Sequence, residues 1–83
     1  MRIGTVTGAV WATRKAERLR GPALLIVTLS GTKLVAADLV GAGPGDRVLL
    51  TFGSAARQDF PEAPIDAAIV AILDGTEEAY VGT

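Results

Sequence analysis

The sequence contains no cysteine and no histidine among its 83 residues. Without cysteine, no disulfide stabilises the fold, and such a composition suits a reducing compartment. The absence of histidine removes the commonest general base, and both absences remove the usual transition-metal ligands. Ser54 is a conceivable nucleophile, but no histidine is present to activate it. We therefore expect neither an enzyme nor a bound cofactor or metal.

The sequence also lacks an excess of charge of either sign, and it lacks long apolar runs. The net charge is −1, so the chain as a whole has no electrostatic attraction to nucleic acid or to an anionic membrane. No apolar run approaches the roughly 20 residues of a transmembrane helix. The apolar stretch near the N-terminus is interrupted by Gly4, Thr5, Thr7 and Gly8, unlike the core of a signal peptide. These features predict a cytosolic protein without a membrane partner.

Aromatic residues are few, with one Trp, one Tyr and two Phe, and basic residues cluster only at positions 14–20. Small barrels that bind single-stranded nucleic acid need a basic groove with several stacking aromatics. A nucleic-acid-binding module of the OB type is therefore an alternative that the composition does not favour. A filter-binding titration at low salt would distinguish it.

Apolar residues, in contrast, are abundant. They make up 49% of the chain, and the mean hydropathy is +0.40. A chain this short forms one domain, residues 1–83, and buries only about 60% of its unfolded surface when it folds alone. We expect part of the apolar surface to be buried against other subunits, the alternative being a tightly packed monomer.

Short apolar runs separated by glycine and proline predict an all-β fold. The turns include a hairpin turn at Ser30–Thr32, a tight turn at Gly53–Arg57 and a loop at Gln58–Pro64. Closure of the strands into a barrel would remove exposed strand edges. The predicted strands are Arg2–Thr13, Ala23–Leu29, Leu34–Ala37, Arg47–Phe52 and Ala67–Leu73.

In the first predicted strand, the apolar residues do not keep to alternate positions throughout. Ile3 falls on an odd position, whereas Val6 and Val10 fall on even ones, so a bulge near Gly4 or Gly8 is expected. This phase places Ala9 and Trp11 on the face opposite to Val10. Trp11 then either anchors an interface or covers a barrel end.

Two polar segments permit two interpretations each. The connection Arg14–Pro22 is either a solvated loop or a basic patch for a partner, and Leu19 could fix it to the body of the protein. The segment Gly75–Thr83, with Glu77 and Glu78, is either a frayed tail or an extension docked on a neighbour.

The loop Gly41–Gly45 superficially suggests phosphate binding. A dinucleotide-binding loop needs a helix after its glycines, but Asp46 and a β-rich run follow here. Structural glycine is the better interpretation. Asp38, Asp46, Asp66 and Asp74 each lie beside a turn, where caps and turn hydrogen bonds explain them more simply than catalysis. For Asp66 this predicts the cap of a short turn before the last strand.

Several motifs in order resemble the EutN/CcmL family of bacterial microcompartment vertex proteins, which includes carboxysome proteins. One difference is the short Ser30–Thr32 connection, where some relatives carry a longer loop. The resemblance is carried by Ile3–Gly8, Asp38-Leu39-Val40-Gly41-Ala42-Gly43, Gly53-Ser54-Ala55-Ala56-Arg57-Gln58 and Pro64–Asp74.

The resemblance implies a small OB-like barrel with short helical turns that assembles as a cyclic homopentamer. It further implies a non-catalytic protein that caps shell vertices in the bacterial cytoplasm, beside hexameric and trimeric shell proteins. A small oligomeric adaptor outside a shell is the other alternative. Under the resemblance, the basic patch would face a shell protein or cargo. The residues expected at subunit contacts or axial loops are Gly41, Ala42, Gly43, Gly53, Ser54 and Arg57.

Overall fold

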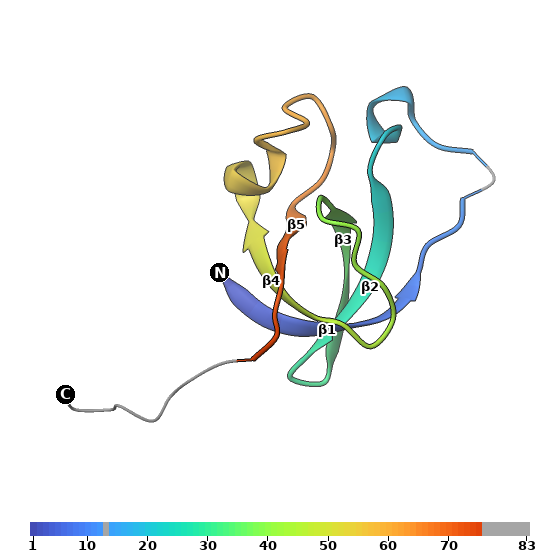
Figure 1. The fold of residues 1–83 in the computed structure, drawn as a ribbon. Helices are drawn as coiled ribbons and strands as arrows, with labels where there is room; N and C mark the ends of the chain where they lie inside the picture. Colours follow the sequence, from blue (N-terminus) through green and yellow to red (C-terminus); the bar gives the residue numbers. More distant parts are fainter. Residues whose placement is uncertain (13, 76–83) are drawn as a thin grey trace.

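The computed structural model describes residues 1–12 and 14–75, which form a closed barrel of five strands (Figure 1). Around the barrel the strand order is β1-β2-β3-β5-β4, and β4 pairs back onto β1. All neighbouring strands are antiparallel except β3 and β5. The predicted all-β, OB-like barrel is confirmed. The strands are β1 (Arg2–Ala9), β2 (Ala23–Leu29), β3 (Thr32–Asp38), β4 (Arg47–Phe52) and β5 (Ala67–Ile72).

The bounds of β2 and β4 match the prediction, whereas β1 is shorter than predicted. Strand β1 ends at Ala9. The Val10 amide still donates a hydrogen bond to the Leu24 carbonyl at 2.8 Å, after which the chain leaves the sheet. The last predicted residue, Thr13, lies outside the described residues.

Strand β3 is longer than predicted because the hairpin turn needs only two residues. Thr32 pairs with Leu29, which leaves Ser30 and Gly31 as the turn. Their φ angles are 50° and 76°, the left-handed pair of a type I′ turn whose twist suits a hairpin. Strand β5 ends one residue earlier than predicted, although the Leu73 amide still donates to the Arg47 carbonyl at 2.8 Å.

The bulge predicted in β1 lies at its Gly8 end. Val6 pairs with Val27 and Gly8 pairs with Ile26, so Thr7 is the extra residue. A second irregularity, not predicted, lies between β4 and β5, where the register shifts at Leu49/Leu50.

The predicted faces of β1 were wrong. Ile3 points outward and is 41% exposed, whereas Gly4 and Val6 are buried. After the bulge, Ala9 packs against the core. The reason lies at Gly4, where a Cβ would stand 2.6 Å from Val27 Cγ1, so that only glycine fits this inward position.

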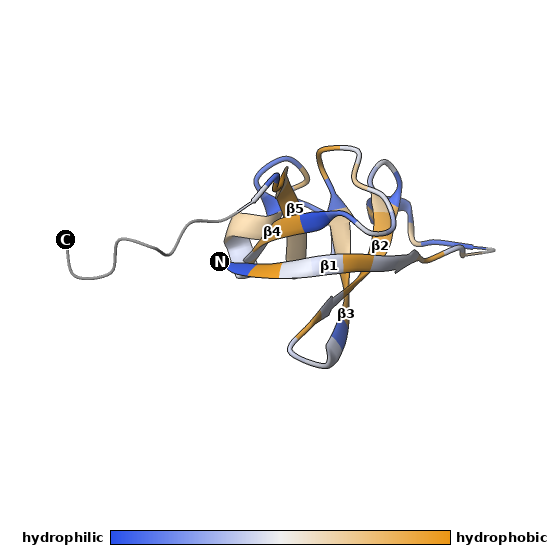
Figure 2. Ribbon diagram, turned by 60° about the horizontal axis from the view of Figure 1, so that its bottom comes forward, coloured by the Kyte–Doolittle hydropathy of each residue, from blue (hydrophilic) through white to orange (hydrophobic). Residues whose placement is uncertain are grey.

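The barrel interior is filled by aliphatic side chains from all five strands, and Figure 2 shows the strands carrying most of the hydrophobic residues. Leu50, Ile69, Val6, Val27 and Val48 are the largest fully buried side chains. Buried positions alternate with more exposed ones along β2, as a filled small barrel requires, whereas β5 begins with three consecutive buried residues.

A second apolar cluster lies where β3 and β5 pair in parallel. It contains Ala37, Ala68 and Ala56, the last from the 3-10 helix η2 (Gly53–Arg57). Leu19 of the short 3-10 helix η1 (Glu17–Leu19) packs against it, which confirms that this side chain fixes the 14–22 connection to the body of the protein. Among the described residues, no helix is long and apolar enough to cross a membrane.

Candidate subunit-contact site

The residues expected at subunit contacts fall in two places, at opposite ends of β4. The loop that holds Gly41, Ala42 and Gly43 precedes this strand, and η2 with Gly53, Ser54 and Arg57 follows it (Figure 1). A strand of this length spans about 20 Å. Within one chain the two sets therefore form two separate surfaces.

The loop before β4 is held by its own acidic side chains. Asp38 Oδ1 accepts hydrogen bonds from the amides of Val40 and Gly41, both at 3.1 Å. Asp46 Oδ2 accepts one from the Gly43 amide at 2.9 Å. The interpretation of these two aspartates as turn residues is confirmed; for Asp66 and Asp74 it stays a prediction.

The same loop is fixed onto β1 beside the bulge. The Gly45 amide donates to the Val6 carbonyl at 2.8 Å, and the Val6 amide donates to the Asp46 carbonyl at 2.9 Å. The amides of Gly41, Gly43 and Gly45 all have partners within the chain, so they are not free to surround a phosphate group. This supports the structural interpretation of the glycines.

Gly43 is nevertheless open to a neighbour. A Cβ at this position would meet nothing within 4 Å, and its φ lies outside the left-handed region. Ala42, in contrast, packs against the barrel core. The loop therefore presents its backbone at Gly43, where another protein chain can approach closely.

Helix η2 presents a surface with little side-chain bulk. Gly53, Ser54 and Ala55 are exposed, whereas Ala56 is buried in the second cluster. The Gly53 amide donates to the Asp66 carbonyl at 3.0 Å, which joins η2 to the start of β5. This surface therefore carries small side chains, is exposed, and is fixed to the barrel.

Arg57 has a partner within its own chain. Its Nη1 donates to the Ile65 carbonyl at 2.8 Å in a partly buried setting. The guanidinium therefore ties η2 to the segment 58–66, a charge-assisted bond that sequence reasoning missed. A direct role of Arg57 at the subunit contact stays a prediction.

The residues that follow β1 include the predicted basic connection, and the hollows beside them were not predicted. Residues 10–12 and 14–21, which we call the arm, lie on the side of the barrel away from β4 and β5 (Figure 1). Beneath it lies a hollow of about 640 Å³ lined by Ala12, Arg14, Lys15, Arg20 and Gly21. Lys15 also lines a neighbouring hollow of about 230 Å³ beside Trp11 and Leu24.

Trp11 lies on the arm with 91% of its surface exposed, so the alternative that it covers a barrel end is wrong. Phe52 packs against the barrel core, and Phe60 packs against the second cluster. Among the aromatic residues of the described chain, only Trp11 is therefore exposed. A single indole does not provide the row of stacking platforms that single-strand binding requires.

No catalytic or metal-binding arrangement is evident in the described part of the chain. Residues 1–12 and 14–75 contain no group of three or more acidic side chains that could hold a metal ion. Ser54 lies exposed in η2 without a histidine anywhere in the sequence to activate it. The predicted tail role of residues 76–83 lies outside the described residues.

Comparison with known proteins gives a consistent result. Residues 1–74 match the family model described as "Ethanolamine utilisation protein EutN/carboxysome". The chain is 45% identical over 83 residues to the carboxysome shell vertex protein CcmL of Synechococcus elongatus, an alignment that covers 89% of this chain and 84% of the relative.

Two solved structures have closely similar folds. The pentameric microcompartment shell protein GrpN from Rhodospirillum rubrum aligns with a TM-score of 0.83 and 42% identity, covering 93% of this chain and 98% of that chain. A pentameric shell protein from the RMM microcompartment aligns with a TM-score of 0.85 and 37% identity, covering 95% and 96% of the two chains.

Proposed function

Because this chain belongs to the EutN/CcmL family, we propose that it is a structural protein that forms a homopentamer and caps vertices of a bacterial microcompartment shell. It acts in the bacterial cytoplasm, as part of a carboxysome-like shell. The observation that carries the proposal is similarity over nearly the whole chain to solved pentameric shell proteins.

The mechanism is geometric and needs no catalysis. When one surface of a protein contacts a different surface of the next copy, a suitable rotation closes the copies into a ring. A five-membered ring supplies the curvature that flat tiles with six-fold symmetry cannot supply. The partners of the pentamer are therefore the hexameric and trimeric proteins that form the flat facets.

The exposed apolar side chains support burial between copies. Among the described residues, the large apolar side chains that remain exposed are Met1, Ile3, Trp11, Val35, Val40 and Ile72. Isolated exposed apolar residues are ordinary, but so many on so small a barrel leave considerable surface for subunit contacts.

We place the two ends of β4 at contacts between subunits or at the axial opening. Gly41, Ala42 and Gly43 form one such surface, and η2 with Gly53, Ser54 and Arg57 forms the other. Both present backbone or small side chains, which permit close approach of a second copy. An opening lined in this way would select solutes by diameter and by amide dipoles.

Two alternatives have different consequences. A nucleic-acid-binding module would need further stacking aromatics beside Trp11, which the described surface does not offer. An oligomeric adaptor outside a shell would form rings but would not alter the closure of shell particles.

The experiment has two parts. Native mass spectrometry of the purified chain should give the mass of five subunits, whereas one or six subunits would overturn the proposal. Co-expression of matching shell tiles with and without this chain should then give closed particles only with it. Particles that are equally closed and impermeable in its absence would show that it is not the vertex cap.

A further inference from the structure

The arm is the most strongly basic part of the surface. Residues 10–21 carry four positive side chains against the single acid Glu17, a net charge of +3. Glu17 is already engaged, because its Oε2 lies 3.0 Å from Arg20 Nε. Arg14, Lys15 and Arg18 remain as the cations that a partner could contact.

The segment that follows η2 carries the opposite charge. Residues 58–66, which we call the acidic loop, contain three carboxylates and no cation, a net charge of −3. Asp59, Glu62 and Asp66 are all exposed. The one ion pair found among the described residues is that between Arg20 and Glu17, so the charges of the arm and the acidic loop are not paired with each other within the chain.

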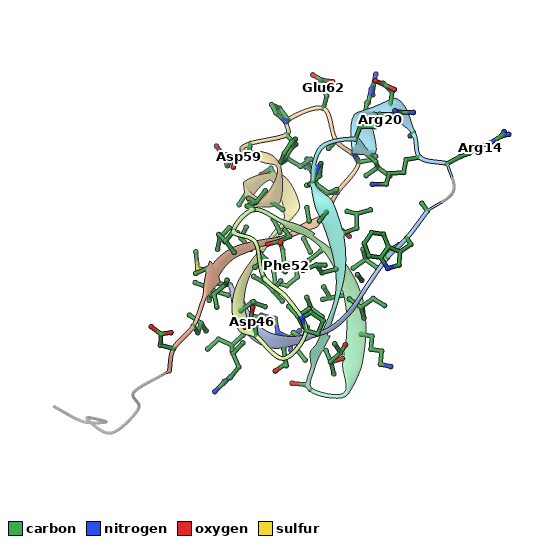
Figure 3. The ribbon with its side chains drawn as sticks, turned by 45° about the vertical axis from the view of Figure 1, so that its right-hand side comes forward. Arg14, Arg20, Asp46, Phe52, Asp59 and Glu62 are labelled. Carbon is green, nitrogen blue, oxygen red and sulfur yellow. The ribbon has the colours of Figure 1, made fainter. Side chains whose placement is uncertain are left out.

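The two charged surfaces lie at the same end of the barrel but face different sides. Figure 3 shows Arg14 pointing away from the barrel on one side, whereas Asp59 lies on the other side. The base of the arm meets the acidic loop in between, where a Cβ on Gly21 would stand 3.1 Å from Phe60 Cε1. Arg14 of the arm and Asp59 of the acidic loop therefore lie on different sides of one chain.

From this arrangement we propose that the arm of one copy docks on the acidic loop and η2 of the next copy, and that this contact closes the ring. The inference rests on the proposed pentamer and identifies the surfaces that build it. A head-to-tail contact between identical copies joins two different surfaces, and opposite charges on the two surfaces favour that contact.

Trp11 provides the apolar centre of this contact. Its side chain is almost fully exposed on the arm, and tryptophan is enriched among residues that dominate binding energy. Beside the acidic loop, η2 offers the small exposed residues Gly53, Ser54 and Ala55, against which a flat indole can pack. The charges surround this centre as a polar rim, the usual arrangement at protein interfaces.

A second apolar surface, around Ile3, fits the arm less well. Exposed Ile3 is paired with half-buried Leu49 and, through it, with half-buried Ala71, but Arg2 and Arg47 flank this row. These arginines would repel the cations of the arm, since like charges placed together disfavour a contact. Charge therefore selects the acidic loop over this row.

The test uses charge reversal of side chains at the surface, of which Lys15 alone is half-buried. The arm variant is Arg14→Glu, Lys15→Glu and Arg18→Glu, and the loop variant is Asp59→Lys, Glu62→Lys and Asp66→Lys. The matched control, Arg2→Glu, Lys33→Glu and Arg47→Glu, has the same net charge as the arm variant, because three reversals take each from −1 to −7. Thermal unfolding of each variant establishes that the barrel is intact.

Analytical ultracentrifugation measures the concentration at which half of the chains are in rings. We expect the arm variant and the loop variant to need at least about tenfold more protein to reach this midpoint. A chain that carries both sets should return to within about threefold of the unmodified chain. The control should stay unchanged, and Trp11→Ala should weaken the ring.

The outcomes separate the inference from the function on which it rests. Three results would overturn the docking contact alone. The arm variant could assemble as well as the unmodified chain, the control could weaken the ring equally, or the doubly reversed chain could fail to recover assembly. If the unmodified chain forms no pentamer, both the function and the contact are wrong.

Discussion

Gly4 and Gly43 show how differently two glycines can be used in one short chain. Gly4 points into the barrel, where Val27 occupies the space that a side chain would need. Gly43 lies in the loop before β4, where an added methyl group would meet no atom within 4 Å. The first glycine serves packing within the chain, and the second leaves the surface open.

The substitution Gly4→Ala should therefore destabilise the fold. The added methyl would overlap Val27 Cγ1 and approach the Thr28 carbonyl oxygen at 3.1 Å, and overpacking of this kind costs about 1–3 kcal/mol. Denaturant unfolding at a fixed protein concentration measures the effect, with Gly75→Ala as the matched control, since a Cβ at Gly75 would also meet nothing within 4 Å. A Gly4→Ala chain as stable as the control would show that the barrel relaxes around this site.

At the scale of single elements, the β2–β3 hairpin contains a compromise. Ser30 is the only non-glycine residue with positive φ in the described chain, at 50°. Type I′ turns favour Asn followed by Gly, because asparagine tolerates the left-handed region better than serine does. The following residue is already Gly31, with φ 76°.

We expect Ser30→Asn to stabilise the chain by about 0.5–1 kcal/mol, the size typical of an improved turn. The measurement is the denaturant midpoint at one protein concentration. Ser30→Ala is the control, because alanine lacks the short polar side chain that lets asparagine adopt the positive φ of this position. Equal shifts for both substitutions would mean that turn geometry is not the cause.

At the scale of the whole molecule, an odd number of subunits has a consequence for mixed rings. In the arm variant both the arm and the acidic loop are negative, and in the loop variant both are positive. In a mixture of the two variants, a contact between two copies of the same variant therefore places like charges together, which is unfavourable. A ring of five cannot alternate two kinds of chain, so at least one contact between like chains always remains.

The equimolar mixture should therefore assemble less completely than the doubly reversed chain, in which every contact pairs opposite charges. Ultracentrifugation of the mixture, the two single variants and the doubly reversed chain at equal total concentration measures this order. A ring with four or six members could alternate the two variants. Its contacts would then join a reversed arm to a reversed loop and an unreversed arm to an unreversed loop by turns, so that every contact would pair opposite charges. Full recovery in the mixture would contradict a five-membered ring with head-to-tail contacts.

The sequence by itself determined the features that depend on neighbours along the chain. The runs Ala23–Leu29 and Arg47–Phe52 have the predicted bounds because each is strongly apolar and ends at turn residues. The family was visible in ordered motifs. A bulge near Gly4 or Gly8 was also predicted, but the phase change between Ile3 and Val6 that suggested it is absent, and the bulge lies after Val6. Asp38 and Asp46 were identified as turn residues because their hydrogen bonds are local.

Only the tertiary structure decided which side chain lies opposite which. Gly4 faces inward because Val27, from another strand, fills the space that a side chain at position 4 would need, and Ile3 beside it therefore faces outward. Arg57 was predicted at a subunit contact, but its bond to Ile65 appears only when the acidic loop folds back over η2. The opposed positions of the arm and the acidic loop likewise follow from closure of the barrel, since contacts between distant segments leave no period in the sequence.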